Sequence, residues 1–161
     1  MEITTYTKND EQAVIELILP IQQIEFGVPV TIADQPDLLD VVNFYCKDNG
    51  NFWVAKENDK LIGTIALIDF GKGRAALRKM FVHKDYRGKE KGVGQALLDT
   101  AINWCRQHGI YEIYLGTVDQ LHAAKRFYIK NGFTKILKED LPEGFPLMQV
   151  DTDFFSFKIA D

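Results

Sequence analysis

The fold of this chain is decided by the stretch Arg87-Gly88-Lys89-Glu90-Lys91-Gly92-Val93-Gly94-Gln95. It follows a strand-like run that ends at Val82 and opens a segment with the spacing of a helix. The first N–H groups of a helix have no partner inside it, and the helix dipole adds partial positive charge there. Glycine lets the backbone approach a ligand closely, and the basic side chains add positive charge. The stretch therefore predicts a phosphate-binding turn between a strand and a helix.

The second half of the chain alternates strands and helices. Apolar residues recur at three- and four-residue steps from Val93 to Cys105, which is typical of an amphipathic helix, and Gly109 is placed to end it. A strand is expected over residues 112–117 and a helix over residues 120–131. Two further strands are expected at 133–137 and 154–159, separated by a loop at 142–146.

The first half of the chain is predicted to contain two helices and several strands connected as hairpins. A helix is expected over residues 10–26, where Pro20 should kink or divide it. A second helix is expected over 36–47, with Leu38, Leu39, Val42 and Phe44 among its apolar positions. Hairpin-type strands before a βα alternation predict a mixed sheet with helices on both faces, in one domain over residues 1–161. The strands expected in this half lie at 2–7, 51–56, 61–68 and 75–82, although residues 75–80 also have high helix propensity.

The composition is that of an ordinary globular protein. The chain has 161 residues, of which 46% are hydrophobic and 26% charged, and a net charge of −4, which argues against general nucleic-acid binding. No apolar run approaches the ~18 residues of a membrane span, and the N-terminus lacks a signal pattern, so a cytoplasmic protein is expected. Cys46 and Cys105 form no CxxC motif or Cys/His cluster, so we expect reduced thiols and no metal site.

Two familiar phosphate-binding motifs do not fit the opening stretch. A P-loop needs G-x-x-x-x-G-K-[ST], and the sixth position counted from Gly88 is Val93. A dinucleotide fingerprint needs G-x-G-x-x-G/A, and the pattern that starts at Gly92 ends in Leu97. Residues 71–76 match those letters, but a hairpin turn explains them better. A nucleotide-dependent redox enzyme is therefore kept only as a distant alternative.

A third interpretation rests on two motifs together. Tyr86-Arg87-Gly88 followed by Gly92-Val93-Gly94 resembles the Q/R-x-x-G-x-G/A signature of the GNAT superfamily of N-acetyltransferases. Downstream, Ala124, Phe127-Tyr128 and Gly132-Phe133 resemble that family's second motif. The chain departs from the family in two places. Two extra residues in the loop put Lys89 at the Q/R position, and Leu121 stands where the family often has asparagine.

The resemblance implies a mixed, mostly antiparallel sheet of six to seven strands and a site for acetyl-coenzyme A. The strand before the loop would pair with the pantetheine arm, and the loop and helix start would hold the pyrophosphate. The implied coenzyme-binding residues are Met80, Phe81, Val82, Arg87, Gly88, Lys89, Lys91, Gly92, Val93, Gly94, Gln95, Ala124 and Tyr128.

The resemblance also implies direct transfer of the acetyl group to an amine, with Tyr128 as the general acid that protonates the leaving thiolate. The general base is open: Glu25, Asp69 and Asp119 are candidates, and a chain of water molecules could equally remove the proton. Glu25 is preferred among the three because it interrupts an apolar region near the implied acceptor site. The acceptor would be a small-molecule or peptide amine, and a homodimer is a family-level expectation. The alternative from another class is a coenzyme-binding sensory module with little catalysis.

Overall fold

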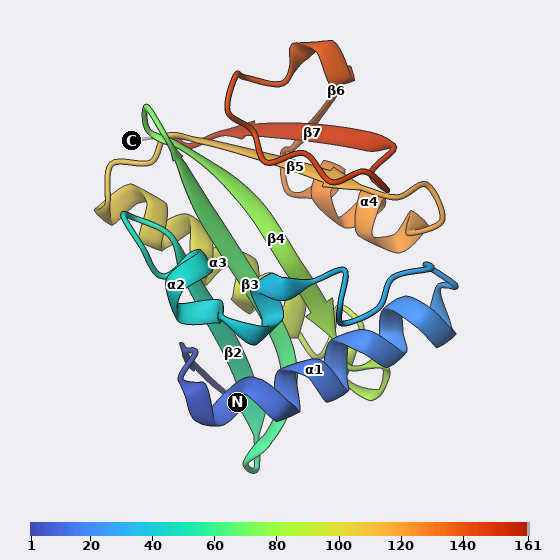
Figure 1. Cartoon of the computed structure of the whole chain (residues 1–161). Coiled ribbons are helices and arrows are strands. Elements are labelled where there is room, and N and C mark those ends of the chain that lie inside the picture. The colour runs from blue at the N-terminus through green and yellow to red at the C-terminus, as the bar shows by residue number, and fades with distance from the viewer. Residues whose placement is uncertain (161) are drawn as a thin grey trace.

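The computed structural model describes residues 1–160, and a seven-stranded sheet lies at the centre of this part of the chain (Figure 1). The strand order is β1-β2-β3-β4-β5-β7-β6; β4 and β5 pair in parallel, and the other neighbours pair antiparallel. The predicted mixed, mostly antiparallel sheet is confirmed. The strands are β1 (Glu2–Thr5), β2 (Asn51–Glu57), β3 (Lys60–Gly71), β4 (Arg74–Val82), β5 (Glu112–Thr117), β6 (Thr134–Ile136) and β7 (Asp153–Lys158).

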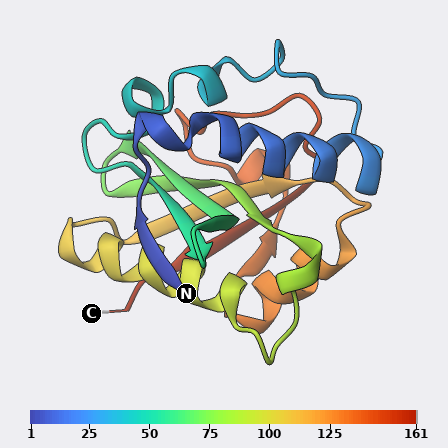
Figure 2. The same ribbon diagram turned by 90° about the horizontal axis from the view of Figure 1, so that it is seen from below.

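Helices cover both faces of the sheet, as predicted (Figure 2). One face carries α1 (Glu11–Pro20), the π-helical turn η2 (Ile21–Glu25), the 3-10 turn η3 (Pro36–Leu39) and α2 (Val41–Tyr45). The other face carries α3 (Val93–Gln107) and α4 (His122–Lys130). Three more 3-10 turns are η1 (Lys8–Asp10), η4 (Lys84–Tyr86) and η5 (Lys138–Asp140). Within residues 1–160, no helix has both the length and the apolar character needed to cross a membrane.

The burial of β3 on both faces explains why its sequence is almost continuously apolar. Ile62, Ile65 and Leu67 belong to the core beneath α3, whereas Leu61 and Ala66 belong to the core beneath α1 and α2. Each of these side chains is less than 9% exposed. A strand buried on both faces loses the alternation of apolar and polar residues, because neither face meets water.

Of the two N-terminal helix predictions, the division of the first helix at Pro20 is confirmed and the second helix needs correction. The α-helix of residues 11–20 ends at Pro20 and continues as η2, in which the Phe26 N–H donates to the Ile21 carbonyl oxygen (3.1 Å). Proline has no N–H and its ring crowds the preceding turn, so a change of helix type there is expected. The helix predicted over 36–47 is instead η3 and α2, separated by Asp40 in a non-helical conformation (φ −152°). Of the four apolar positions named for it, only Leu38 is buried; Leu39, Val42 and Phe44 are exposed.

Strand β4 determines where a site can form. Its pairing with β3 overrides the helix propensity of residues 75–80, so the strand prediction is confirmed. Along its other edge, β4 pairs with β5 only through residues 74–76. Beyond Ala76 the two strands diverge (Figure 1), and the register with β3 shifts beside Lys79, which has a positive φ of 53°. The rest of β4 therefore has an edge that no strand within residues 1–160 covers.

Candidate active site

Two adjoining cavities occupy the opening between β4 and β5. The large cavity has a volume of about 570 Å³ and extends to the loop before α3. The small cavity has a volume of about 140 Å³ and extends toward the loop before β7. The residues that line both cavities come from the position after η2, from β4, and from α4 and the position before it. They are Phe26, Met80, Phe81, Leu121, Ala124 and Tyr128.

The large cavity gathers most of the residues predicted to bind a coenzyme. Lys91 and Val93 are the two of that set that do not line it. Val93 is 4% exposed and packs in the core. The Lys91 ammonium instead lies 6.0 Å from the centre of the Tyr86 ring. The predicted residues that do line it are Met80, Phe81, Val82, Arg87, Gly88, Lys89, Gly92, Gly94, Gln95, Ala124 and Tyr128.

The loop from Gly88 to Gly92 ends directly on α3. The Gly88 carbonyl oxygen accepts hydrogen bonds from the N–H groups of Lys91 and Gly92, each at 3.2 Å, so the Gly92 N–H is used within the loop. Gly92 has φ 66°, a left-handed conformation that glycine adopts without strain. The Ala96 N–H donates to the Gly92 carbonyl oxygen (3.0 Å) and begins the helical ladder. The N–H groups of residues 93–95 precede this ladder and point out of the helix start, as an anion site requires.

Two lysines give this end of the large cavity its positive charge. Lys89 of the loop and Lys130 at the end of α4 both line the cavity. The adjacent Lys89 ammonium lowers the pKa of Lys130, and partial desolvation lowers it further. An anion between two such ammonium groups relieves their repulsion, so the pair is suited to a phosphate. Lys130 was not predicted, because its place beside Lys89 depends on how α4 packs against the loop.

Arg87 connects the loop to η2. Its Nε donates to the Val82 carbonyl oxygen (2.9 Å), and its guanidinium lies 5.7 Å from the centre of the Phe26 ring. Both terminal nitrogens donate to the Glu25 carboxylate, with Nη2 3.0 Å from Oε2. Glu25 lines neither cavity. The structure thus brings the predicted Arg87 and Glu25 together as an ion pair beside the large cavity.

Tyr128 lies where the two cavities meet. It is 6% exposed, and its ring packs against Phe127, Phe133 and Phe155. Burial raises the pKa of the Tyr128 hydroxyl well above its ordinary value of 10.0. This hydroxyl therefore keeps its proton at physiological pH and is available as a hydrogen-bond donor.

The small cavity has a polar wall on β4. Lys79 is 8% exposed, and its Nζ donates to Gln35 Oε1 (2.6 Å) and lies 3.5 Å from Asp37 Oδ2. The same Asp37 oxygen accepts a hydrogen bond from the Tyr45 hydroxyl (2.6 Å), and Gln22 pairs with Gln35. Burial lowers the pKa of Lys79, and Asp37 partly offsets this effect. The Thr64 hydroxyl donates to the Lys79 carbonyl oxygen (2.6 Å). This hydrogen bond and the side-chain network of Lys79 together hold β4 in place where its register with β3 shifts.

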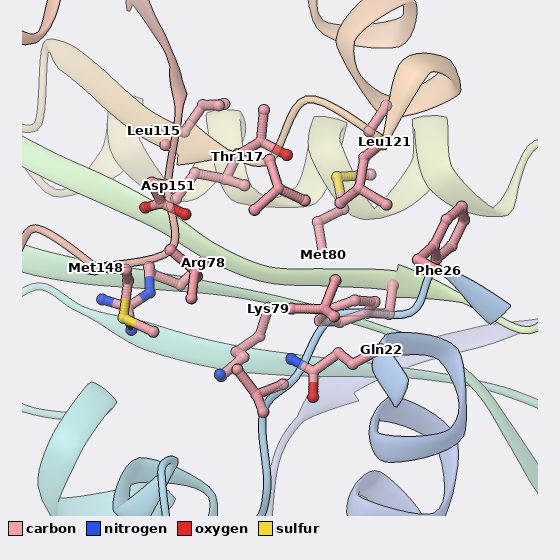
Figure 3. A pocket seen from close by; sticks show the side chains of 18 of the residues that line it. Gln22, Phe26, Arg78, Lys79, Met80, Leu115, Thr117, Leu121, Met148 and Asp151 are labelled. Carbon is pink, nitrogen blue, oxygen red and sulfur yellow. Dashed lines mark hydrogen bonds between the residues drawn. The ribbon is translucent and has the colours of Figure 1, made fainter. Parts of the chain in front are cut away.

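Asp151 is the carboxylate of the small cavity (Figure 3). It lies at the same end of the cavity as Arg78 and Met148, whereas Phe26 and Leu121 lie at the other end. Burial raises the pKa of Asp151 to about 6, although nearby Arg78 and Lys79 act to lower it. The carboxylates weighed from sequence lie elsewhere: Asp69 caps backbone N–H groups, and Asp119 pairs with Lys125 (2.8 Å).

Sequence comparison identifies the family to which this arrangement belongs. A model described as the acetyltransferase (GNAT) family matches residues 15–133. The chain belongs to the GNAT acetyltransferase family. The match includes the loop before α3 and extends through α4, and these elements form the large cavity. The fold expected from the resemblance is therefore confirmed.

Known members of the GNAT family share both sequence and structure with this chain. The chain is 32% identical over 109 residues to the probable N-acetyltransferase camello of Xenopus tropicalis, covering 66% of this chain and 49% of that protein. It thus spans about half the length of such curated relatives. The structure superposes on a GNAT-family acetyltransferase from Staphylococcus aureus with a TM-score of 0.94, 39% identity and 99% coverage of both chains. PaiA N-acetyltransferase from Thermoplasma acidophilum, solved with coenzyme A, shares the fold (TM-score 0.72, 21% identity, 98% coverage of both chains).

Sequence analysis assigns no role to the charged side chains of the small cavity, which are Arg78, Lys79 and Asp151. One local feature could have indicated the two cations: Arg78 and Lys79 are consecutive in a strand, so their side chains point to opposite faces of the sheet. A cation buried in an apolar core needs a polar partner. Asp151 gives no comparable signal, because it comes near β4 only through the packing of the loop that precedes β7.

Proposed function

We propose that residues 1–161 form one N-acetyltransferase domain that moves an acetyl group from acetyl-coenzyme A directly to an amine. The observation that carries this proposal is that Tyr128 lines two adjoining cavities of different character. The large one ends at the start of a helix between basic side chains, and the small one contains charged groups for a second substrate. Family membership and the coenzyme A complex of the Thermoplasma relative support the choice of coenzyme.

The phosphate end of the coenzyme would bind at the start of α3. There the N–H groups of residues 93–95 supply donors, and the helix dipole favours negative charge. Lys89 and Lys130 add charge-assisted hydrogen bonds, and the loop from Gly88 to Gly92 allows the backbone to approach the phosphates closely.

The pantetheine arm would lie along the open edge of β4, beside Met80, Phe81 and Val82. These residues line the large cavity, and β5 has already diverged from β4 at this point. Arg87 holds the Val82 carbonyl oxygen and so fixes the end of that edge. Ala124 leaves room on the opposite wall, where a larger side chain on α4 would narrow the cavity.

Tyr128 would act as the general acid. Acetyl-coenzyme A supplies the thioester carbon that the amine attacks and the thiolate that leaves. Because the Tyr128 hydroxyl keeps its proton at working pH, it can donate a hydrogen bond to the sulfur and transfer the proton as negative charge develops there. Its place at the junction of the cavities puts it near the point where the two substrates would meet.

Direct transfer is supported by the state of the cysteines. Cys105 is fully buried in the core, and burial raises the pKa of its thiol to about 12. Burial also raises the pKa of Cys46, whose Sγ lies 3.5 Å from Asn51 Oδ1. Neither thiol lines either cavity, and both are poor nucleophiles, so an acetyl-cysteine step has no group to form on.

The test is thiol release from acetyl-coenzyme A in the presence of a panel of small amines and short peptides, together with calorimetric binding of acetyl-coenzyme A. Amine-dependent thiol release with formation of the amide supports the proposal. Tight binding of acetyl-coenzyme A without amine-dependent release rejects it in favour of a sensory module. Binding of dinucleotides in preference to acetyl-coenzyme A rejects both.

A further inference from the structure

The small cavity contains a carboxylate, Asp151, that forms no ion pair among the described residues. Within residues 1–160, Asp151 has no ion-pair partner within 4.0 Å, in contrast to Asp153, which pairs with Lys125 at 3.2 Å. Its backbone is fixed by the hydrogen bond from its N–H to the Met148 carbonyl oxygen (3.1 Å). Removing a carboxylate from water without pairing it is unfavourable. A group kept in this way is a candidate for binding a positively charged substrate.

The position of this carboxylate is built into the sheet. Gly116 of β5 also lines the small cavity, and a Cβ atom placed on it would lie 2.4 Å from Asp151 Oδ2. A side chain at residue 116 would therefore displace the carboxylate, so glycine makes its approach to β5 possible. On the β4 side, Arg78 Nη2 lies 2.8 Å from Met148 Sδ and holds the loop that carries Asp151.

The titratable groups around Asp151 come from two elements. Among residues 1–160, the other titratable side chains that line the small cavity are Arg78 and Lys79 of β4 and Tyr128 of α4. Lys79 is turned toward Gln35 and Asp37, so its charge is largely satisfied on the far side of the strand. Arg78 remains near Asp151 and favours its ionised form. Asp151 is thus the anionic group of a cavity that also contains the predicted general acid.

We propose, on the basis of the proposed acetyl transfer, that Asp151 binds the acceptor as an ammonium ion and takes its proton, which makes it the general base. The substrate class is a primary or secondary amine that is protonated at neutral pH. The pKa of about 6 supports this role, because such a carboxylate is mostly ionised at neutral pH yet more basic than an exposed one.

The proton and bond changes balance without a further reactant. The N–H bond of the ammonium breaks and its proton moves to Asp151, which leaves a lone pair on nitrogen. The nitrogen bonds to the acetyl carbon, the carbon–sulfur bond breaks, and Tyr128 gives its hydroxyl proton to the sulfur. The second proton lost by the nitrogen as the amide forms restores Tyr128, and Asp151 releases its proton to solvent.

The test compares Asp151→Asn with the matched control Glu143→Gln, which removes one carboxylate from the same loop at an exposed position outside both cavities. For the amine that gives the highest turnover, kcat/KM of the unmodified protein should fall as the pH drops below about 6. Asp151→Asn should lower kcat/KM about 100-fold at pH 7.5 and remove this dependence, with unchanged binding of acetyl-coenzyme A. Glu143→Gln should behave like the unmodified protein.

A second readout separates a base from a structural group. Aniline is neutral at pH 7.5 and needs no base before attack, whereas benzylamine arrives as an ammonium ion. Asp151→Asn should therefore lose benzylamine acetylation far more than aniline acetylation. Equal losses for both amines, or a pH profile unchanged by the substitution, would overturn the assignment. Absence of amine-dependent turnover in the unmodified protein would instead reject the acetyltransferase function itself.

Gly116→Ala provides an independent variant that leaves Asp151 in place but pushes its carboxylate away from β5. It should reduce kcat/KM for benzylamine in the same direction as Asp151→Asn while acetyl-coenzyme A still binds. Full benzylamine activity in a folded Gly116→Ala protein would contradict the proposed position of the base.

Discussion

The Glu25 carboxylate accepts two hydrogen bonds from the Arg87 guanidinium and thereby joins η2 to the loop that leads into α3. These residues are 62 positions apart in the sequence, and the pair lies at the edge of the large cavity. Because Arg87 also holds the Val82 carbonyl oxygen, the pair connects η2 with the end of β4. The sequence favours Glu25 as the general base, whereas its contact with Arg87 indicates that it positions the loop. Kinetics can separate these two roles.

Glu25→Gln should raise the KM for acetyl-coenzyme A about threefold to tenfold and change kcat by less than about threefold, because it loosens Arg87 without touching the reacting atoms. The measurement is steady-state kinetics with acetyl-coenzyme A varied at saturating amine. A loss of kcat near 100-fold with a changed pH profile would instead identify Glu25 as the base. Stability should change by less than about 1 kcal/mol, since both side chains are about one-third exposed.

Tyr128→Phe should lower kcat about 100-fold and leave the Kd for acetyl-coenzyme A unchanged, because it removes only the proton donor. Single-turnover thiol release and calorimetry measure the two quantities. Tyr6→Phe is the matched control: within residues 1–160, the buried Tyr6 hydroxyl has no hydrogen-bond partner, and Tyr6 lines neither cavity. That substitution should keep full activity and raise stability by about 1 kcal/mol. Unchanged turnover of Tyr128→Phe would reject the general-acid assignment.

Lys89→Ala and Lys130→Ala should each weaken acetyl-coenzyme A binding about tenfold, the equivalent of about 1.4 kcal/mol, because each removes a charge-assisted contact to phosphate. The effect should shrink as salt is raised, since exposed charges are screened. Lys91→Ala is the control of equal charge, and its side chain lies by Tyr86 outside the cavity lining. If Lys91→Ala weakens binding as much as Lys89→Ala does, the phosphates bind on the other side of the loop.

Asp151→Asn should increase stability at neutral pH. The carboxyl of Asp151 has a pKa of about 6 in the folded chain against an ordinary value of 3.8, so the folded state binds the proton more tightly. The unfavourable contribution of this group therefore grows as the pH rises from 4 to 6 and is complete above pH 6. Replacing it should raise the unfolding free energy at pH 7.5 by on the order of 1 kcal/mol, given its partial exposure.

The measurement for this last prediction is denaturant unfolding of Asp151→Asn, Glu143→Gln and the unmodified protein at pH 4 and pH 7.5. The gain of Asp151→Asn should disappear at pH 4, where the native carboxyl is already protonated. A gain of equal size at both pH values would mean that it does not arise from desolvation of the charge. Greater stability accompanied by lost activity is the expected behaviour of a group kept for chemistry.

The sequence was sufficient to predict those helices, strands and turns whose structure depends on a local residue pattern. The periodicity of α3, the apolar run of β3 and the glycine turn between β4 and α3 all appear as predicted. The prediction of one continuous helix over residues 36–47 was wrong because Asp40 has a non-helical conformation and divides the segment into η3 and α2. The buried apolar side chains of this segment are Leu38, Val41 and Tyr45, whereas Leu39, Val42 and Phe44 are exposed.

The site was predictable only where it coincides with a motif. The loop before α3 and Tyr128 are marked by glycines and by an aromatic pair, whereas Lys130 and Asp151 are ordinary residues whose positions depend on tertiary packing. Asp151 lies beside Gly116 because β7 pairs with β5, an antiparallel pairing between strands separated by α4 and β6 in the chain. No local spacing encodes such a neighbourhood.

The brief pairing of β4 with β5 has a consequence for how such a protein can diversify. Three residues of β4 join a half-sheet of β1 to β4 to a half-sheet of β5, β7 and β6, and the small cavity lies where the two half-sheets separate beyond them. Substitutions in the loop before β7 or in the segment after η2 would change the walls of the small cavity and leave the loop before α3 and the short β4–β5 pairing untouched. Under the proposed acetyl transfer, such substitutions would alter the choice of acceptor amine without disturbing the coenzyme-binding end.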